Sequence, residues 1–246
     1  MDKSNPISCI TFDLWNTLII DKPGFGDNRA RLRIESVKQT LFNIGEIFSE
    51  QTLEKAYSQC ITYCNHIRTE GKDISFEIQI ELFIKKIDPY LLSRLTDTDF
   101  SQILSSYLNP FYLYPPPVHP KASKILAKLS SDGYKLGLIS NTAMTPGSTF
   151  RQYMDKQQIL QYFDVLTFSD EVGLAKPSCK IFNITLNKLK AIPEETIHIG
   201  DDFDNDVIGA LTAGMKVIWI NSSSIKKKVI QPTYMVNDLE EVIKKI

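Results

Sequence analysis

The stretch Ile7-Ser8-Cys9-Ile10-Thr11-Phe12-Asp13 decides the fold class of this chain. Its first six residues form a short, mostly apolar run, which is typical of a buried strand, and a carboxylate follows directly. Similar runs recur downstream of about residue 116, where they alternate with segments of helical periodicity. The expected strands are 135–139, 165–168, 196–199 and 216–220, and the expected helices are 120–129, 178–190 and 205–213. Strands that alternate with helices predict a parallel sheet with helices on both faces.

The segment between this first strand and residue 116 shows helical periodicity only. One helix is expected over 28–42, a second after the N-cap Ser49, a third from about Ser75 and a fourth from about Thr98. The helical block is expected to end at Asn109-Pro110, ahead of three consecutive prolines at 115–117. Such a proline run stiffens the connection that follows the block.

These patterns predict an α/β chain with two domains. Residues 1–19 and 116–246 would form a Rossmann-like, three-layer core with five or more parallel strands, and residues 20–115 would form an all-helical cap domain. An insertion at the carboxyl end of a strand lies over the crevice where open α/β sheets bind ligands. We therefore expect the cap to cover the functional site.

Composition and charge exclude several classes of function. Of the 246 residues, 43% are hydrophobic and 23% are charged, which is ordinary for a soluble globular protein. The formal net charge of −1 provides no general basic field for nucleic acid, and the apolar runs are too short to span a bilayer. No signal peptide is recognised, so we expect a cytoplasmic protein with four reduced cysteines. The sequence carries no signal for an oligomeric state.

Two sequence features receive an ordinary interpretation. Cys60 and Cys64 share a helix face, but only His66 lies nearby, so a zinc site is disfavoured. The lysine run at 226–228 is expected to lie on a solvated surface.

Four short polar segments stand at the ends of predicted strands. They are Phe12-Asp13-Leu14-Trp15-Asn16-Thr17-Leu18, Leu138-Ile139-Ser140-Asn141-Thr142, Gly173-Leu174-Ala175-Lys176-Pro177 and His198-Ile199-Gly200-Asp201-Asp202-Phe203-Asp204-Asn205-Asp206. Taken singly, each is more simply explained as a turn, a loop with side-chain-to-backbone bonds or a helix cap. Their occurrence together and in this order indicates one shared site at the carboxyl ends of the strands.

With these four segments the sequence resembles the haloacid dehalogenase-like superfamily. The resemblance covers the whole predicted core, and the helical block is similar to the α-helical cap of that family. It implies a hydrolase that uses Mg²⁺, with a small phosphate ester as substrate.

The resemblance also implies roles for the residues that would bind and attack the substrate. Asp13 would attack phosphorus in line and form an aspartyl-phosphate. Ser140 and the backbone N–H of Asn141 would hold phosphoryl oxygens. Lys176 would neutralise Asp13 and the charge that develops on the phosphoryl group.

A Mg²⁺ site is implied by the same resemblance. The family's sheet order puts the first and fourth strands side by side, which would bring Asp13 and Asp201 together. Mg²⁺ would be held by these two carboxylates and the backbone carbonyl of Trp15, because it is a hard cation that prefers oxygen ligands. Asp206 would be a further ligand or a residue of the outer shell, although an acid in the first turn of a helix also has an ordinary explanation.

The sequence departs from the family pattern after the nucleophile. Family phosphatases have a second Asp two positions on, which protonates the leaving group and then activates water, and this chain has Trp15 there. An indole donates a hydrogen bond but does not exchange a proton in this range. The next position, normally Gly, is Asn16, which tolerates the left-handed conformation that the turn requires.

The departure at Trp15 leaves three functions open. The family's dehalogenases also carry an aromatic residue there, but they are metal-free and lack the acid at the position of Asp201. Because this chain keeps Asp201 and Asp206, we place a phosphatase ahead of a 2-haloacid dehalogenase. A third alternative is a weakly active protein that binds a phospho-ligand, since general acid–base catalysis contributes roughly 10²- to 10⁴-fold in rate.

Other polar residues receive mostly structural interpretations. Arg29, Arg31 and Arg33 open the first cap helix; at most one or two of them face a substrate, and a solvated face is the preferred interpretation. Among the remaining residues, His119 is expected on a surface loop, His198 is expected to be buried and hydrogen-bonded, Tyr112 and Tyr114 are expected to pack at the hinge, and Asp21 and Asp27 are either replacement acids or solvated linker residues.

Overall fold

The fold is an α/β structure with a six-stranded parallel sheet. The computed structural model describes residues 6–222 and 230–246, so the lysine run at 226–228 lies outside the described residues. The strands are β1 (Cys9–Phe12), β2 (Lys135–Ser140), β3 (Val165–Phe168), β4 (Thr196–Gly200), β5 (Lys216–Ile220) and β6 (Tyr234–Val236). Their order in the sheet is β3-β2-β1-β4-β5-β6, and every pair is parallel. The predicted fold class is therefore confirmed.

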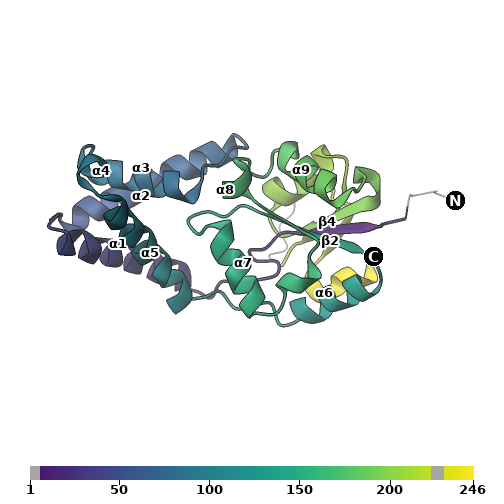
Figure 1. Ribbon diagram of the computed structural model, residues 1–246. Helices are drawn as coiled ribbons and strands as arrows, with labels where there is room; N and C mark the ends of the chain where they lie inside the picture. Colours follow the sequence, from purple (N-terminus) through teal and green to yellow (C-terminus); the bar gives the residue numbers. More distant parts are fainter. Residues whose placement is uncertain (1–5, 223–229) are drawn as a thin grey trace.

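Helices cover both faces of the sheet (Figure 1). One face packs on α6 (Ala122–Ser131), α7 (Gly147–Lys156) and the 3₁₀ segment η4 (Leu239–Lys244). The other face packs on α9 (Cys179–Leu189) and α10 (Gly209–Thr212). Successive strand residues point to opposite faces, so Ile218 joins the first cluster and Val217 the second. The remaining short elements of the core are α8 (Ser169–Val172), the 3₁₀ turns η1 (Leu160–Tyr162) and η2 (Pro193–Glu195), and the π-helix η3 (Phe203–Ile208).

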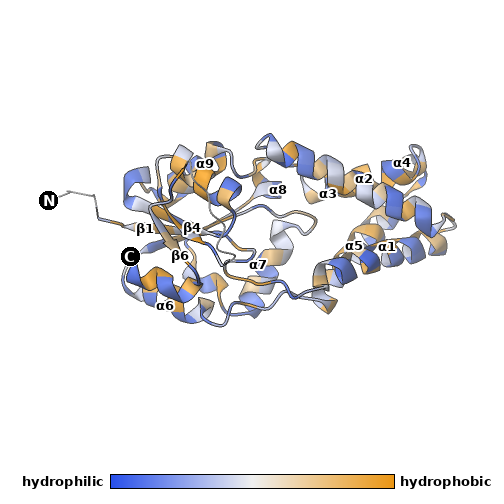
Figure 2. Cartoon of the chain, turned by 180° about the vertical axis from the view of Figure 1, so that it is seen from behind, coloured by the Kyte–Doolittle hydropathy of each residue, from blue (hydrophilic) through white to orange (hydrophobic). Residues whose placement is uncertain are grey.

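The helical block contains five helices with a hydrophobic cluster of their own. They are α1 (Phe25–Asn43), α2 (Glu50–Thr69), α3 (Phe76–Ile87), α4 (Leu91–Arg94) and α5 (Asp97–Leu113). Ser49 and Ser75 cap α2 and α3 by accepting a bond from a backbone N–H, as is usual at helix starts. Apolar residues from all five helices meet in one cluster around Phe83 and Tyr107. These helices lie to one side of the sheet (Figure 1), and polar and apolar residues are mixed along each of them (Figure 2).

The predicted end of the helical block at Asn109-Pro110 was wrong. Helix α5 continues through Pro110 to Leu113. A proline inside a helix removes one backbone hydrogen bond, but the next turn re-forms because the N–H of Tyr114 donates to the carbonyl of Pro110 at 3.0 Å. Phe111 is fully buried against Phe150 and Tyr153 of the core, and this packing is lost if the helix stops at residue 110.

Two neighbouring chain segments connect the helical block to the core. They run antiparallel, with an isolated bridge between Ile19 and Val118. The N–H of Ile20 donates to Pro117 and the N–H of His119 donates to Leu18. The two connections between the helical block and the core are therefore hydrogen-bonded to each other.

Candidate active site

The site is built at the carboxyl edge of the sheet, where β1 and β4 are adjacent. In the parallel register Phe12 lies beside Ile199, and the N–H of Asp13 donates to the carbonyl of Ile199 at 2.9 Å. Asp13 therefore leaves β1 next to the point where β4 leads into Asp201. Asn16 adopts the left-handed conformation with φ of 52°, so the turn survives without a glycine, as predicted.

Three carboxylates meet at this edge. Ligand atoms of Asp13, Asp201 and Asp206 all lie within 4.8 Å of one another. Asp206 comes this close because residue 200 is a glycine: a Cβ at Gly200 would stand 2.3 Å from the Asp206 carboxyl group. The N–H of Asp202 donates to Asp206 at 2.9 Å and fixes the second carboxyl oxygen.

Lys176 stands between two of these carboxylates. Its ammonium donates to Asp13 and, at 2.7 Å, to Asp206, and it is 2% exposed. Burial works against the charge of Lys176, but the two carboxylates raise its pKa above the usual value. Burial works against Asp206 too, yet Lys176 and His198 hold its pKa well below the usual range.

The other two carboxylates are destabilised as anions. Burial, together with the charges of Asp206 and Asp201, raises the pKa of Asp13 to about 8 in spite of Lys176. Burial and the charge of Asp206 raise the pKa of Asp201 to about 6. One lysine therefore does not offset three clustered carboxylates.

Ser140 ends β2, and Asn141 follows it beside Lys176. The side-chain amide of Asn141 donates to the carbonyl of Lys176 at 3.0 Å and accepts from its N–H at 2.9 Å. This pair of bonds joins the two core loops that carry these residues. A hollow of about 160 Å³ remains over the carboxylates and is lined by Asp13, Trp15, Asn16, Asn141, Lys176, Asp201, Asp202, Asn205 and Asp206.

His198 is buried behind the carboxylates, as predicted. Its Nε2 lies 3.2 Å from Asp206 and its Nδ1 lies 2.9 Å from the hydroxyl of Thr11. Burial lowers the pKa of His198, which favours the neutral ring. The sequence indicated a buried histidine, but its contact with Asp206 emerges only from the fold.

The interpretation of the first cap helix as a solvated face was wrong for two of its arginines. Arg29 and Arg33 are 6% and 5% exposed, whereas Arg31 is exposed and pairs with Glu35. Spacing of four residues places Arg29 and Arg33 on one face. Arg29 lies 5.5 Å over the ring of Trp15 and donates to Asp21, and Arg33 donates to the hydroxyl of Thr145 at 2.8 Å; both therefore face the core.

The remaining candidates separate into packed and exposed residues. Asp21 is engaged by Arg29, while Asp27 is exposed. His119 lies in a loop, as expected; it is half-buried, and its Nε2 lies 3.5 Å from the carboxylate of Asp238. Tyr114 packs at the hinge against Phe25, and half-exposed Tyr112 donates to Gln152.

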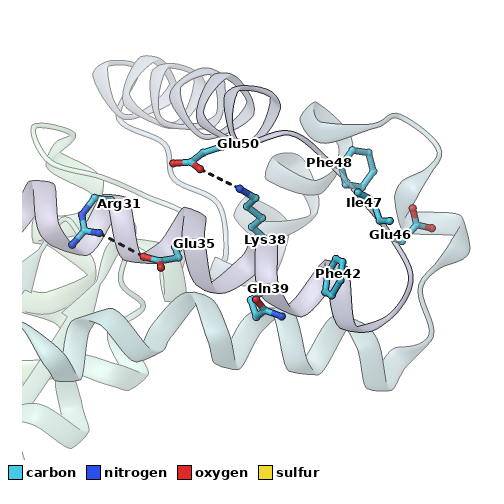
Figure 3. A pocket seen from close by; sticks show the side chains of 9 residues that line it. All are labelled: Arg31, Glu35, Lys38, Gln39, Phe42, Glu46, Ile47, Phe48 and Glu50. Atoms are coloured by element: carbon cyan, nitrogen blue, oxygen red, sulfur yellow. Dashed lines mark hydrogen bonds and ion pairs between the residues drawn. The ribbon is translucent and has the colours of Figure 1, made fainter.

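A second hollow lies in the helical block, and of the candidate residues above it is lined by Arg31 alone. It has a volume of about 490 Å³ and lies between α1 and the segment that leads into α2 (Figure 3). Its charged side chains are paired, Lys38 with Glu50 at 3.1 Å, Arg31 with Glu35 at 3.6 Å, and Glu46 with Arg94 outside the hollow at 2.6 Å. The chemistry is therefore concentrated at the carboxyl edge of the sheet. No helix in the described ranges is long and apolar enough to cross a membrane.

Comparisons with known proteins give a family match, a similar phosphatase and similar solved structures. The family model described as haloacid dehalogenase-like hydrolase matches residues 44–220. A glyceraldehyde 3-phosphate phosphatase of Methanothermobacter thermautotrophicus is 28% identical over 218 residues, which cover 88% of this chain and 86% of that protein. Among solved structures, a 2-haloacid dehalogenase from Pseudomonas syringae has a TM-score of 0.70 at 19% identity, and a HAD phosphatase from Thermococcus onnurineus has 0.64 at 23%; each alignment covers 97% of both chains. At these identities the two structures support the fold alone.

Proposed function

Because the chain belongs to the haloacid dehalogenase-like hydrolases, we propose that it is a Mg²⁺-dependent phosphatase that acts on a small phosphate ester through Asp13. The observation that carries the proposal is the cluster of Asp13, Asp201 and Asp206 around Lys176. We place the core in residues 1–19 and 116–246, the cap in residues 20–115, and the enzyme in the cytoplasm.

The donor set fits a hard divalent cation. Three carboxylates with ligand atoms within 4.8 Å offer oxygen only, which Mg²⁺ prefers. The raised pKa values of Asp13 and Asp201 indicate that this cluster lacks positive charge. Asp13, the carbonyl of Trp15 and Asp201 would hold the ion, with Asp206 beside them. When bound, Mg²⁺ would keep Asp13 ionised and neutralise phosphoryl oxygens.

The remaining steps of the proposed reaction are assigned to residues of the chain. The carboxylate of Asp13 attacks phosphorus, the ester P–O bond breaks and the alkoxide leaves and takes a proton from solvent, so that the phosphoryl group is carried on Asp13. Ser140 and the N–H of Asn141 hold phosphoryl oxygens. Lys176, fixed between Asp13 and Asp206, neutralises the charge that develops. Water then attacks phosphorus and releases inorganic phosphate.

Dehalogenation remains the second candidate function because Trp15 is aromatic. In that reaction Asp13 attacks the carbon that bears the halogen, and halide leaves. The retained Asp201 and Asp206 favour phosphate transfer, since three carboxylates without a cation oppose one another's ionisation.

The proposal is tested by two product assays on the full-length chain. We expect phosphate release from p-nitrophenyl phosphate with Mg²⁺, loss of that activity in excess chelator, and no halide release from 2-chloropropionate. Asp13→Asn should remove turnover, and Asp201→Ala should remove the dependence on divalent cations together with most of the activity. Activity that persists in chelator would exclude the metal assignment, and halide release would favour the dehalogenase. Tight binding of a phosphate ester without either product would favour a phospho-ligand-binding protein.

A further inference from the structure

The cap contacts both core loops of the candidate site, one through the loop between α2 and α3 and the other through Arg68 of α2 and through Ser169. This cap loop, residues 70–75 between α2 and α3, pairs with the residues that precede Lys176. Lys72 and Leu174 form an antiparallel bridge, and the N–H of Ala175 donates to the carbonyl of Gly71 at 3.1 Å. The N–H of Asp73 donates to Gly173 at 3.2 Å. The cap loop therefore supports the segment that ends at Lys176.

The carboxylate of Asp73 reaches the other core loop, which follows Asn141. One of its oxygens accepts from the hydroxyl of Ser169 at 2.6 Å, and that hydroxyl accepts from the N–H of Thr142 at 2.9 Å. The same oxygen accepts from Arg68 at 3.1 Å, and Arg68 also donates to the carbonyl of Ala143 at 2.7 Å. The backbone of residues 142 and 143 is thus held from the cap by two routes.

The contacts of the cap and the bonds of Asn141 together form a closed ring of contacts around the candidate site. Asn141 joins the two core loops directly through its bonds to the backbone of Lys176. The cap loop joins them a second time, from outside. The cap loop is therefore linked, directly or through Ser169, to the backbone on both sides of the proposed phosphoryl pocket.

The ion pair within this arrangement is desolvated and fully bonded. The side chains of Arg68 and Asp73 are 9% and 0% exposed. A buried pair is costly unless further hydrogen bonds satisfy it, and here Asp73 also accepts from Ser169 and from the N–H of Ile74. The cap loop packs closely against the start of α9, because a Cβ at Gly71 would stand 2.7 Å from the Cβ of Ser178. Buried ion pairs add little net stability. We therefore interpret the Arg68–Asp73 pair as a positioning contact rather than a stabilising one.

We propose that Asp73, with Arg68 and Ser169, is a positioning group that the cap supplies to the active site. The inference rests on the proposed function, because it assigns these residues to the reaction of Asp13. Docking of the cap loop fixes Ser140, Asn141 and Lys176 in the arrangement that binds the phosphoryl group. A misplacement of about 1 Å can cost about 100-fold in rate, so completion of the site depends on the cap.

The test removes one hydroxyl. Ser169→Ala breaks the link between Asp73 and Thr142 but leaves the Arg68–Asp73 pair in place. Thr185→Ala is the matched control, because Thr185 is also fully buried and its hydroxyl bonds to another buried hydroxyl, that of Thr167, at 2.8 Å. With Mg²⁺ and p-nitrophenyl phosphate, Ser169→Ala should lower kcat/KM at least tenfold and raise the inhibition constant of inorganic phosphate. Thr185→Ala should lose similar thermal stability with kcat/KM within twofold of wild type.

Two charge variants extend the test. Asp73→Asn should lower kcat/KM more than Ser169→Ala does, because it also leaves Arg68 buried without its anion. Arg68→Lys should recover part of the activity that Arg68→Met loses, because it keeps the charge. Equal kcat/KM in wild type and Ser169→Ala, or equal losses in Ser169→Ala and Thr185→Ala, would overturn the proposal.

A second readout does not depend on turnover. Amide hydrogen exchange in wild type should be slow at Thr142 and in residues 173–176, and faster at both places in Ser169→Ala and Asp73→Asn. Unchanged exchange would overturn the positioning role even if the enzyme is active. Absence of any phosphatase activity in wild type, with exchange altered as expected, would instead exclude the proposed function and leave the structural coupling intact.

Discussion

At position 15 an indole occupies the place of the family's acid and base. Trp15 packs edge-on against Phe150 at 5.6 Å and under the guanidinium of Arg29, and its N–H has no partner within the described residues. Attack by Asp13 needs little help when the leaving group is good, but hydrolysis of the aspartyl-phosphate needs a base. We predict a burst of p-nitrophenol followed by slow turnover in a rapid-quench experiment.

Two variants at this position sharpen the burst experiment. Trp15→Phe should keep the burst, because the ring remains and neither side chain is a base. Trp15→Asp should raise the steady rate if its carboxylate reaches the water, at a cost of about 3 kcal/mol in stability for the lost packing. Fast linear release by wild type would indicate that another group acts as the base, and Asp21 is a poor candidate because Arg29 engages it.

The carboxylate cluster makes a second prediction at the residue scale. The pKa values of about 8 at Asp13 and about 6 at Asp201 imply protons that must leave before a cation binds. Mg²⁺ affinity should therefore rise between pH 6 and pH 8, with net proton release. Isothermal titration calorimetry in two buffers of different ionisation enthalpy measures that release. Affinity that stays constant across this range, with no buffer dependence, would contradict the prediction.

At the scale of the element, Asp170 determines how α7 begins. Both of its carboxyl oxygens accept from the N–H of Gly147 at 3.2 Å, which satisfies a donor at the start of the helix. Burial raises the pKa of Asp170 to about 6 although this bond lowers it. Between about pH 4 and pH 6 the folded state holds a proton that the unfolded state has lost, so ionisation of Asp170 decreases stability as pH rises.

Asp170→Asn isolates this contribution, because the amide oxygen still accepts from Gly147 but does not ionise. Urea denaturation at pH 4, 5, 6 and 7 should show that wild type loses stability relative to the variant across this window. A constant difference between the two proteins from pH 4 to pH 7 would mean that Asp170 does not titrate there. The active-site carboxylates are the same in both proteins and cancel in the comparison.

At the scale of the whole molecule, we predict that the cap moves when substrate enters. The hollow over Asp13 is about 160 Å³, below the roughly 300 Å³ of small ligand pockets. The bridge between Lys72 and Leu174 has to part when the cap opens, and cysteines at paired antiparallel positions lie within disulfide range. Lys72→Cys with Leu174→Cys, in a Cys179→Ser background, should lose ester turnover when oxidised and regain it with reductant.

The matched control is Lys72→Cys alone in the same background. Its ester turnover should be the same under oxidising and reducing conditions. The oxidised double variant should still bind inorganic phosphate, which is small enough for the hollow. Equal turnover by its oxidised and reduced forms would mean that substrate enters without separation of the cap loop from the core.

Local pattern determined the elements. The strands at 165–168 and 216–220 were predicted to the residue, Ser49 caps a helix as expected, and a helix begins directly after Ser75, where one was expected. These signals lie within a few residues of the strand or helix that they specify, so they can be recognised in the sequence without knowledge of the fold. The helix expected over 205–213 instead begins with a π-helix, in which the N–H of Val207 reaches the carbonyl of Asp202; sequence periodicity does not distinguish such turns.

The sequence alone also predicted which residues would carry the chemistry, because Asp13, Ser140, Lys176 and Asp201 lie at or near recognisable runs at the edge where parallel strands end. Only the tertiary structure decided what surrounds them. The burial of Arg33 and the contact of Asp73 with Ser169 join residues about 100 positions apart, and such pairs leave no local period in the chain. They form because the cap is placed over the sheet edge by its own hydrophobic cluster and its two connections, and that placement is a property of the whole fold.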